Sequence, residues 1–137
     1  MVIDAAFKNH RVLVLIDGSN FYHRTDEIGV STFIRFDYRR FAEWLAEGRP
    51  IVEKIYYTGT IRKQEGNAKS QQLVSDQQRL FAHLESREQE FTVFRGHVMK
   101  QPGQYKEKGV DVKIAVDIVL KAAKNQYDTV ILVSSDT

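Results

Sequence analysis

Three aspartates that lie far apart in the sequence have the setting of a metal-binding site. Asp17 and Asp136 each follow a short apolar run, and Asp111 lies at the start of a segment with helical spacing. The two runs have the composition of strands that are buried on both faces of a parallel sheet. Because ligands bind outside the carboxyl ends of such strands, we expect the three carboxylates to meet at that edge.

The chemistry of such a cluster points to a hard divalent cation. Clustered carboxylates repel one another and persist most readily when a cation neutralises them. Oxygen ligands without His or Cys favour Mg²⁺ or Mn²⁺ over zinc. A site of this kind activates a water molecule and stabilises charge on a phosphate group, so we expect hydrolysis of a phosphodiester bond. Each motif alone has a simpler interpretation, because Asp-Gly is a common turn pair and a helix dipole favours an acid in the first turn.

The helix expected over about 109–125 carries Asp111 at its start. Asp111 shares one side of this helix with Ala115, Ile118 and Ala122. We expect this apolar side to pack on the sheet, which would point the Asp111 carboxylate along the strand ends.

Asp117 lies on the same helix, about 120° around its axis from Asp111. Lys113 and Lys121 flank it at four residues on either side. Asp117 is therefore either a further member of the acidic site or the ion-pair partner of these lysines. The sequence leaves both interpretations open.

One α/β domain over residues 1–137 would position these acids. Apolar runs predict strands at about 11–17, 51–58, 91–95 and 129–134, and helical spacing predicts helices at about 37–47, 70–87 and 109–125. Alternating strands and helices form a parallel sheet through right-handed crossovers. Since Thr137 follows the last strand closely, we expect a domain truncated at its C-terminal end. The last strand would then expose apolar surface unless more chain or a partner covers it.

Composition excludes several other classes of protein. The absence of cysteine excludes disulfides, thiolate zinc sites and cysteine nucleophiles. No apolar run is long enough to span a membrane, and the first residues lack the apolar core of a signal peptide. We expect a cytoplasmic protein.

Basic residues gather in two segments near the acids, although the net charge is only +2. Lys100, Lys106 and Lys108 precede Asp111, and Arg62 and Lys63 lie in a polar loop. They form either an ordinary solvated face or a rim that binds phosphate groups.

At the acidic motifs the sequence resembles the NYN domain of the LabA type, within the PIN-like nuclease superfamily. The matching segments are 15–22, 108–113 with Asp117 further on, and 130–136, in the same order and spacing. The resemblance implies a three-layer PIN-like (Rossmannoid) domain with a central parallel sheet. The last motif of the family usually continues with another acid two positions later, whereas here only Thr137 follows.

The resemblance also implies a metal-dependent ribonuclease. Asp17, Asp111 and Asp136 would bind Mg²⁺ or Mn²⁺, Asp117 would be a further acidic position, and Asn20 would support Asp17. RNA would be the substrate, with its backbone held by the basic rim. PIN-like domains often pair, so a homodimer is an expected assembly.

Two other functions are compatible with the sequence. A non-catalytic RNA-binding or regulatory NYN module would keep the fold and the basic rim with an incomplete metal site. A phosphatase of the haloacid-dehalogenase type also places an aspartate after its first strand. That chemistry usually needs a second acid two residues later, where this chain has Ser19.

Overall fold

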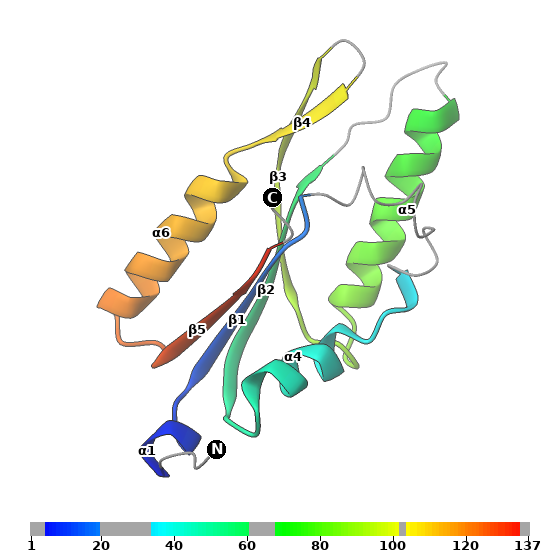
Figure 1. Cartoon of the computed structure of the whole chain (residues 1–137). Coiled ribbons are helices and arrows are strands. Elements are labelled where there is room, and N and C mark those ends of the chain that lie inside the picture. The colour runs from blue at the N-terminus through cyan, green and yellow to red at the C-terminus, as the bar shows by residue number, and fades with distance from the viewer. Residues whose placement is uncertain (1–4, 20–33, 61–67, 102–103, 135–137) are drawn as a thin grey trace.

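The protein folds as a five-stranded sheet with helices on both faces (Figure 1). The computed structural model describes residues 5–19, 34–60, 68–101 and 104–134. Strands β1 (Val12–Asp17), β2 (Ile51–Thr60), β3 (Thr92–Gln101) and β5 (Thr129–Val133) are parallel, and β4 (Gln104–Lys108) is antiparallel to β3. The strand order is β4-β3-β2-β1-β5. The predicted α/β class with a central parallel sheet is confirmed.

Alternate residues of β1 face the two cores of the domain. Val12, Val14 and Ile16 pack against α4 (Tyr38–Ala46) and α5 (Ala68–Leu84) on one side. Leu13 and Leu15 pack against α6 (Val110–Ala123) on the other. The strand is buried on both faces because a helix layer covers each of them, which explains its continuous apolar sequence.

The predicted helices are present, with ends displaced by a few residues. α4 begins after Asp37, whose carboxylate accepts a hydrogen bond of 3.0 Å from the Arg40 backbone N–H. It ends at Glu47 and Gly48, which both adopt positive φ angles of 52° and 81°. A short helix, α1 (Ala5–Lys8), precedes β1. None of the described helices is long and apolar enough to cross a membrane.

The segment before α6 differs from its prediction. We expected a strand that ended near Arg95, followed by a loop. Instead β3 continues to Gln101 and the chain returns as β4, with His97 paired to Lys108 and Lys100 to Tyr105. Pro102-Gly103, a strong turn dipeptide, stands between the two strands and was the overlooked signal for this hairpin.

The predicted packed side of α6 was wrong. The side that faces the sheet is displaced by about one residue, which is about 100° around the helix axis. Val110, Ile114 and Asp117 are buried against the sheet. Of the predicted side, Ile118 packs on the core, whereas Asp111, Ala115 and Ala122 are exposed. Branched aliphatic residues remove more apolar area from water than alanines do, which favours the observed side. It can include Asp117 because partners satisfy that carboxylate, as described below.

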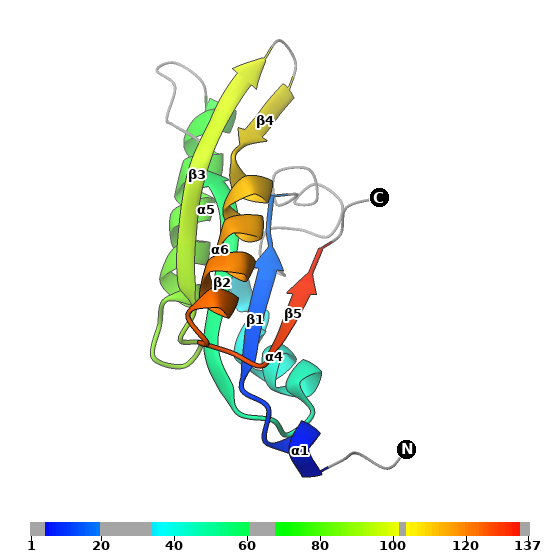
Figure 2. The ribbon, with the colours of Figure 1, turned by 90° about the vertical axis from the view of Figure 1, so that its left-hand side faces the viewer.

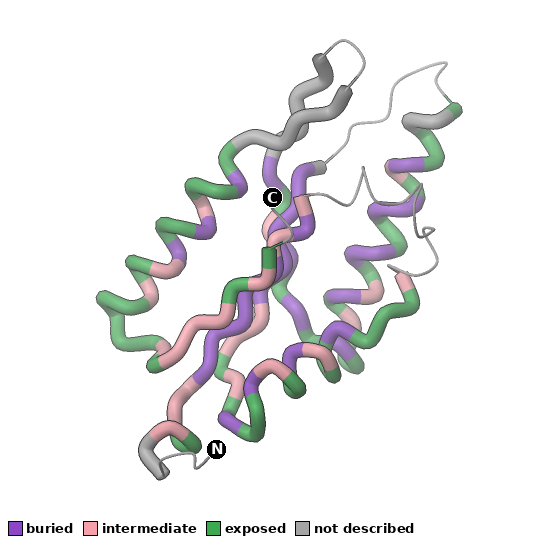
Figure 3. The backbone as a smooth tube through the Cα atoms, in the orientation of Figure 1, coloured by how far each residue is buried: buried purple, intermediate pink, exposed green. Residues whose placement is uncertain are grey.

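An apolar surface remains exposed on α6 and the neighbouring edge strand. Figure 3 shows exposed positions along the outer side of α6. Large apolar side chains with at least 46% exposure occur there and on β5: Val112, Val116, Val119, Leu120 and Leu132. On the last strand itself the predicted exposure is observed at Leu132, while the other residues of β5 are partly buried.

Candidate metal centre

The carboxyl ends of β1, β2 and β5 and the N-terminal end of α6 lie toward the same end of the molecule (Figures 1 and 2). Asp17, the last residue of β1, pairs with Tyr57 of β2. On the other side of β1, Ile16 pairs with Val133, the last residue of β5. The parallel register therefore brings the chain out of β5 beside the end of β1.

A tight turn holds Asp17 at this edge. Its Oδ1 accepts a hydrogen bond of 3.0 Å from the Ser19 backbone N–H. The Gly18 N–H donates to the Tyr57 carbonyl oxygen at 2.7 Å, which ties the turn to β2. A Cβ at position 18 would lie 2.2 Å from Cζ of Tyr56, so only glycine fits beneath that ring. Asp17 itself is half-buried.

Asp111 lies in the first turn of α6 and is exposed. The helix begins at Gly109, which adopts a φ of 88° and has no side chain to cap the free backbone N–H groups. Those groups carry partial positive charge, which stabilises a carboxylate in the first turn. Asp111 is therefore a solvent-accessible carboxylate at the N-terminal end of α6, and this end of the helix lies toward the carboxyl ends of the strands.

Asp117 is buried between α6 and β2, where two groups satisfy its carboxylate. The Tyr57 hydroxyl donates to Oδ2 at 2.7 Å, and Nζ of Lys113 lies 2.9 Å from Oδ1. Burial, and then Asp117 itself, raises the pKa of the Tyr57 phenol above its usual value. Lys121 pairs instead with Glu53 of β2 at 2.9 Å. One of the two predicted ion pairs of Asp117 is thus observed and the other is not.

Tyr57 is the residue that sequence reasoning missed at this site. Its apolar neighbours identify it only as a strand residue, and its hydroxyl meets Asp117 from 60 positions away in the chain. No local pattern in the sequence signals that contact.

Several predicted site residues lie outside the part of the chain that the structure describes. They are Asn20, Arg62, Lys63 and Asp136. Lys100 lies on β3, and Lys106 and Lys108 lie on β4; the structure describes the backbone at these positions but not the three side chains. Within the described residues, no group of three or more His, Asp or Glu side chains could hold a metal ion.

The donor set at the edge fits a hard cation. Asp17 and Asp111 offer only oxygen atoms, and neither is engaged by a cationic side chain in any described ion pair. Carboxylate oxygens of this kind are the ligands that Mg²⁺ and Mn²⁺ prefer. Asp17, Asp111 and the predicted Asp136 are therefore the residues that would hold such an ion.

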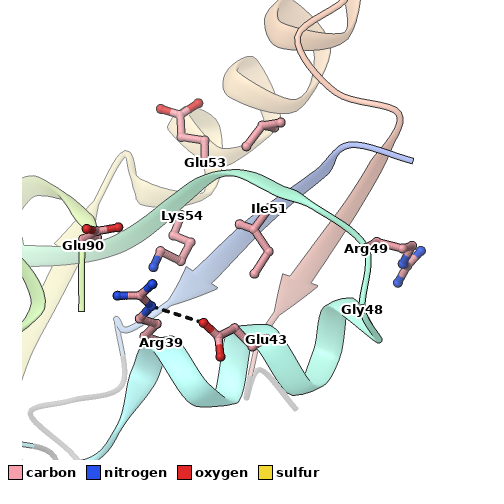
Figure 4. A pocket seen from close by; sticks show the side chains of 9 residues that line it. Arg39, Glu43, Gly48, Arg49, Ile51, Glu53, Lys54 and Glu90 are labelled. Carbon is pink, nitrogen blue, oxygen red and sulfur yellow. Dashed lines mark hydrogen bonds and ion pairs between the residues drawn. The ribbon is translucent and has the colours of Figure 1, made fainter. Parts of the chain in front are cut away.

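A separate cleft of about 420 Å³ lies between α4 and the first residues of β2 (Figure 4). Arg39 pairs with Glu43 at 3.2 Å, and the Lys54 ammonium donates to the Gln89 carbonyl oxygen at 2.7 Å. Cations and carboxylates alternate along this cleft, so their charges largely offset one another. It lies at the amino ends of the strands, away from Asp17.

The sheet and the helices on its two faces define an α/β domain with acidic residues at the carboxyl ends of its strands. The chain belongs to the NYN domain family, whose sequence profile matches residues 11–137. The family resemblance read from the acidic motifs is thereby confirmed.

A solved structure has the same fold. It is the crystal structure of a protein of unknown function from Vibrio parahaemolyticus, with 24% identity and a TM-score of 0.55. The match covers 99% of this chain and 71% of that one. No functionally curated protein is significantly similar to this chain.

Proposed function

We propose that the protein is a metal-dependent ribonuclease that hydrolyses phosphodiester bonds of RNA. One observation carries this proposal. A hydrogen-bonded turn holds the Asp17 carboxylate at the edge of the sheet where α6 begins, and Asp111 in the first turn of α6 is accessible to solvent. Membership of the NYN family, within the PIN-like nucleases, supports the reaction class.

In this proposal Asp17, Asp111 and Asp136 hold Mg²⁺ or Mn²⁺, and Asn20 supports Asp17. A bound divalent cation stabilises the charge that develops on a phosphate group while water attacks it. The Ser19 N–H and the anchored Gly18 keep the Asp17 carboxylate in one orientation, so little reorganisation is needed when the ion binds. The Asp111 carboxylate lies in the first turn of α6 and is exposed, so a cation can reach it from solvent.

The RNA backbone would lie along the β3–β4 hairpin. This hairpin extends beyond the end of β1 on the side of the molecule where the acids lie (Figure 1). Lys100, Lys106 and Lys108 would contact phosphate groups there, and Arg62 and Lys63 would contribute from the segment that follows β2 in the sequence.

Asp17→Asn and Asp111→Asn test this function directly. Each keeps the size of the side chain but removes a negative charge that the cation needs. We expect RNA cleavage in single-turnover assays with Mn²⁺ to fall by about 100-fold or more. Calorimetric titration should show weaker Mn²⁺ binding in both variants. Glu43→Gln is a matched control, because its carboxylate pairs with Arg39 on α4, away from the edge.

The enzymatic proposal fails if the wild-type protein with Mn²⁺ leaves single-stranded, structured and tRNA-like RNA intact. Binding of these RNAs without cleavage would instead support a non-catalytic RNA-binding module.

A further inference from the structure

We propose that Tyr57 is a positioning residue that fixes the place of Asp111 relative to Asp17. This inference rests on the proposed metal site and concerns how the fold holds that site together. Tyr57 is hydrogen-bonded both to the turn that carries Asp17 and to the helix that carries Asp111.

The main chain of Tyr57 holds the Asp17 turn. Tyr57 is the register partner of Asp17 in the parallel β1–β2 pair. Its carbonyl oxygen accepts the Gly18 N–H at 2.7 Å, one residue beyond the candidate ligand. Displacement of Tyr57 would therefore displace the Asp17 turn as well.

The side chain of Tyr57 holds α6. Its ring is fully buried beside Leu15, Val110 and Ile114. From there the hydroxyl donates to Oδ2 of Asp117 at 2.7 Å. A hydrogen bond between a phenol and a carboxylate in an apolar core is strong and directional, so it fixes both the axial position and the rotation of the helix.

Asp117 is suited to this structural role rather than to metal binding. Asp117 is 7% exposed, and its two carboxylate oxygens contact the Tyr57 hydroxyl and the Lys113 ammonium group. Asp111 lies six residues earlier on the same rigid helix, about 9 Å along its axis. Val110 and Ile114 pack on the sheet without directional bonds, and Lys121 pairs with Glu53 in the last turns of α6. The hydrogen bond between Tyr57 and Asp117 therefore adds a directional link between β2 and the half of α6 that carries Asp111.

The variant Tyr57→Phe tests the proposal, because it removes the hydroxyl and keeps the ring in the core. We expect Mn²⁺ affinity to fall by about 10-fold, as for other groups that orient a metal ligand. We also expect kcat for RNA cleavage to fall while KM for RNA changes less. Without any metal, amide hydrogen exchange at Lys113 and Ile114 should become faster, because the first turn of α6 is less firmly held.

Tyr127→Phe is the matched control. The Tyr127 hydroxyl donates to the Ile118 carbonyl oxygen of α6 at 2.7 Å, and its ring packs against the same core. This variant also removes one phenolic hydrogen bond from α6, but not one that joins the helix to β2. We expect a comparable loss of thermal stability with Mn²⁺ affinity within about twofold of wild type.

Three outcomes would overturn the inference. Equal losses of Mn²⁺ affinity in Tyr57→Phe and Tyr127→Phe would indicate a general loosening of α6. Unchanged affinity in Tyr57→Phe would show that the hydroxyl does not position the acids. Higher affinity would indicate that Asp117 is itself a metal ligand, for which the tyrosine hydroxyl competes.

A second variant distinguishes a positioning role of Asp117 from a metal-binding role. Asp117→Asn retains an oxygen that accepts the Tyr57 hydroxyl. The positioning role predicts a smaller loss of Mn²⁺ affinity than in Tyr57→Phe, and a ligand role predicts a larger one. Failure of the proposed function itself has a different signature: Asp111→Asn would then leave Mn²⁺ binding unchanged, while the exchange experiment would still report on Tyr57.

Discussion

At the scale of single residues, the acidic edge depends on a position where no side chain fits. Gly18 is buried beneath the Tyr56 ring, which is itself 3% exposed and packs edge-on against Tyr38. Because Gly18 has no side chain, the turn can lie against the ring while its N–H donates to the Tyr57 carbonyl oxygen of β2. This hydrogen bond directs the Asp17 carboxylate toward the Ser19 N–H. The sequence identifies Gly18 as a turn residue but cannot reveal the ring above it, because Tyr56 lies on another strand.

We expect Gly18→Ala to lower the free energy of unfolding by about 1–3 kcal/mol, the usual range for overpacking a core. The added Cβ would lie 2.2 Å from Cζ of Tyr56, so the ring or the turn must shift. Denaturant unfolding of both proteins measures the difference. Gly48→Ala is the control, since φ there is 81° with no atom within 4 Å, and it reports backbone strain without a clash. Wild-type stability in Gly18→Ala would contradict the geometry of the turn.

At the scale of elements, local patterns predicted the strands and helices well, and long-range contacts decided the rest. The apolar run of β1 and the Asp37 cap of α4 are contained within a few residues, so their elements were placed correctly. The packed side of α6 was misjudged because that helix has apolar residues on two sides, and only contact with β2 selects between them. Periodicity alone cannot supply that choice.

The start of the β1–β5 pair illustrates such a long-range contact. Arg11, just before β1, donates its backbone N–H to Asp128 Oδ2 at 2.8 Å, and its guanidinium lies 3.1 Å from Oδ1. Hydrogen bonds from the Arg11 side chain, and then from its backbone, lower the pKa of Asp128 to about 2. This pair lies directly before the first register pair of β1 and β5, Val12 with Thr129.

The lowered pKa predicts a pH dependence for Asp128→Asn. A carboxylate whose pKa is lower in the folded protein stabilises it above the unfolded pKa, near 3.9, and loses this effect as pH falls through about 2. We therefore expect wild type to have the higher melting temperature at pH 7 and the gap to close below about pH 2. The gap should be small, since both side chains are 37% exposed. A gap of the same size at pH 7 and pH 2 would contradict this account, and Glu43→Gln serves as a control for an ordinary surface pair.

At the scale of the whole molecule, the acids and the cations that would attract RNA lie on different elements. The acids lie at the ends of β1 and α6, and the lysines lie on the β3–β4 hairpin. The net charge of +2 gives the protein only a weak overall field. Carboxylates at the ends of β1 and α6 would repel an RNA backbone until a cation neutralises them. In the proposed function, attraction would therefore come from a local group of cations, and the β3–β4 hairpin brings three lysine positions to the same end of the molecule.

Replacing Lys100, Lys106 and Lys108 together by Gln tests that arrangement. Each phosphate contact to a single strand contributes about −0.7 to the slope of log K against log salt concentration, so the slope should become shallower by about 2. KM for RNA should rise while kcat at saturation stays close to wild type, because in the proposed function the lysines would hold the backbone and the acids would act on the scissile phosphate. A control with the same change of net charge combines exposed residues at the opposite end of the molecule: Lys8, Arg87 and Lys124. If both triple variants flatten the salt dependence equally, the protein attracts RNA through its overall charge, and the hairpin is not the binding surface.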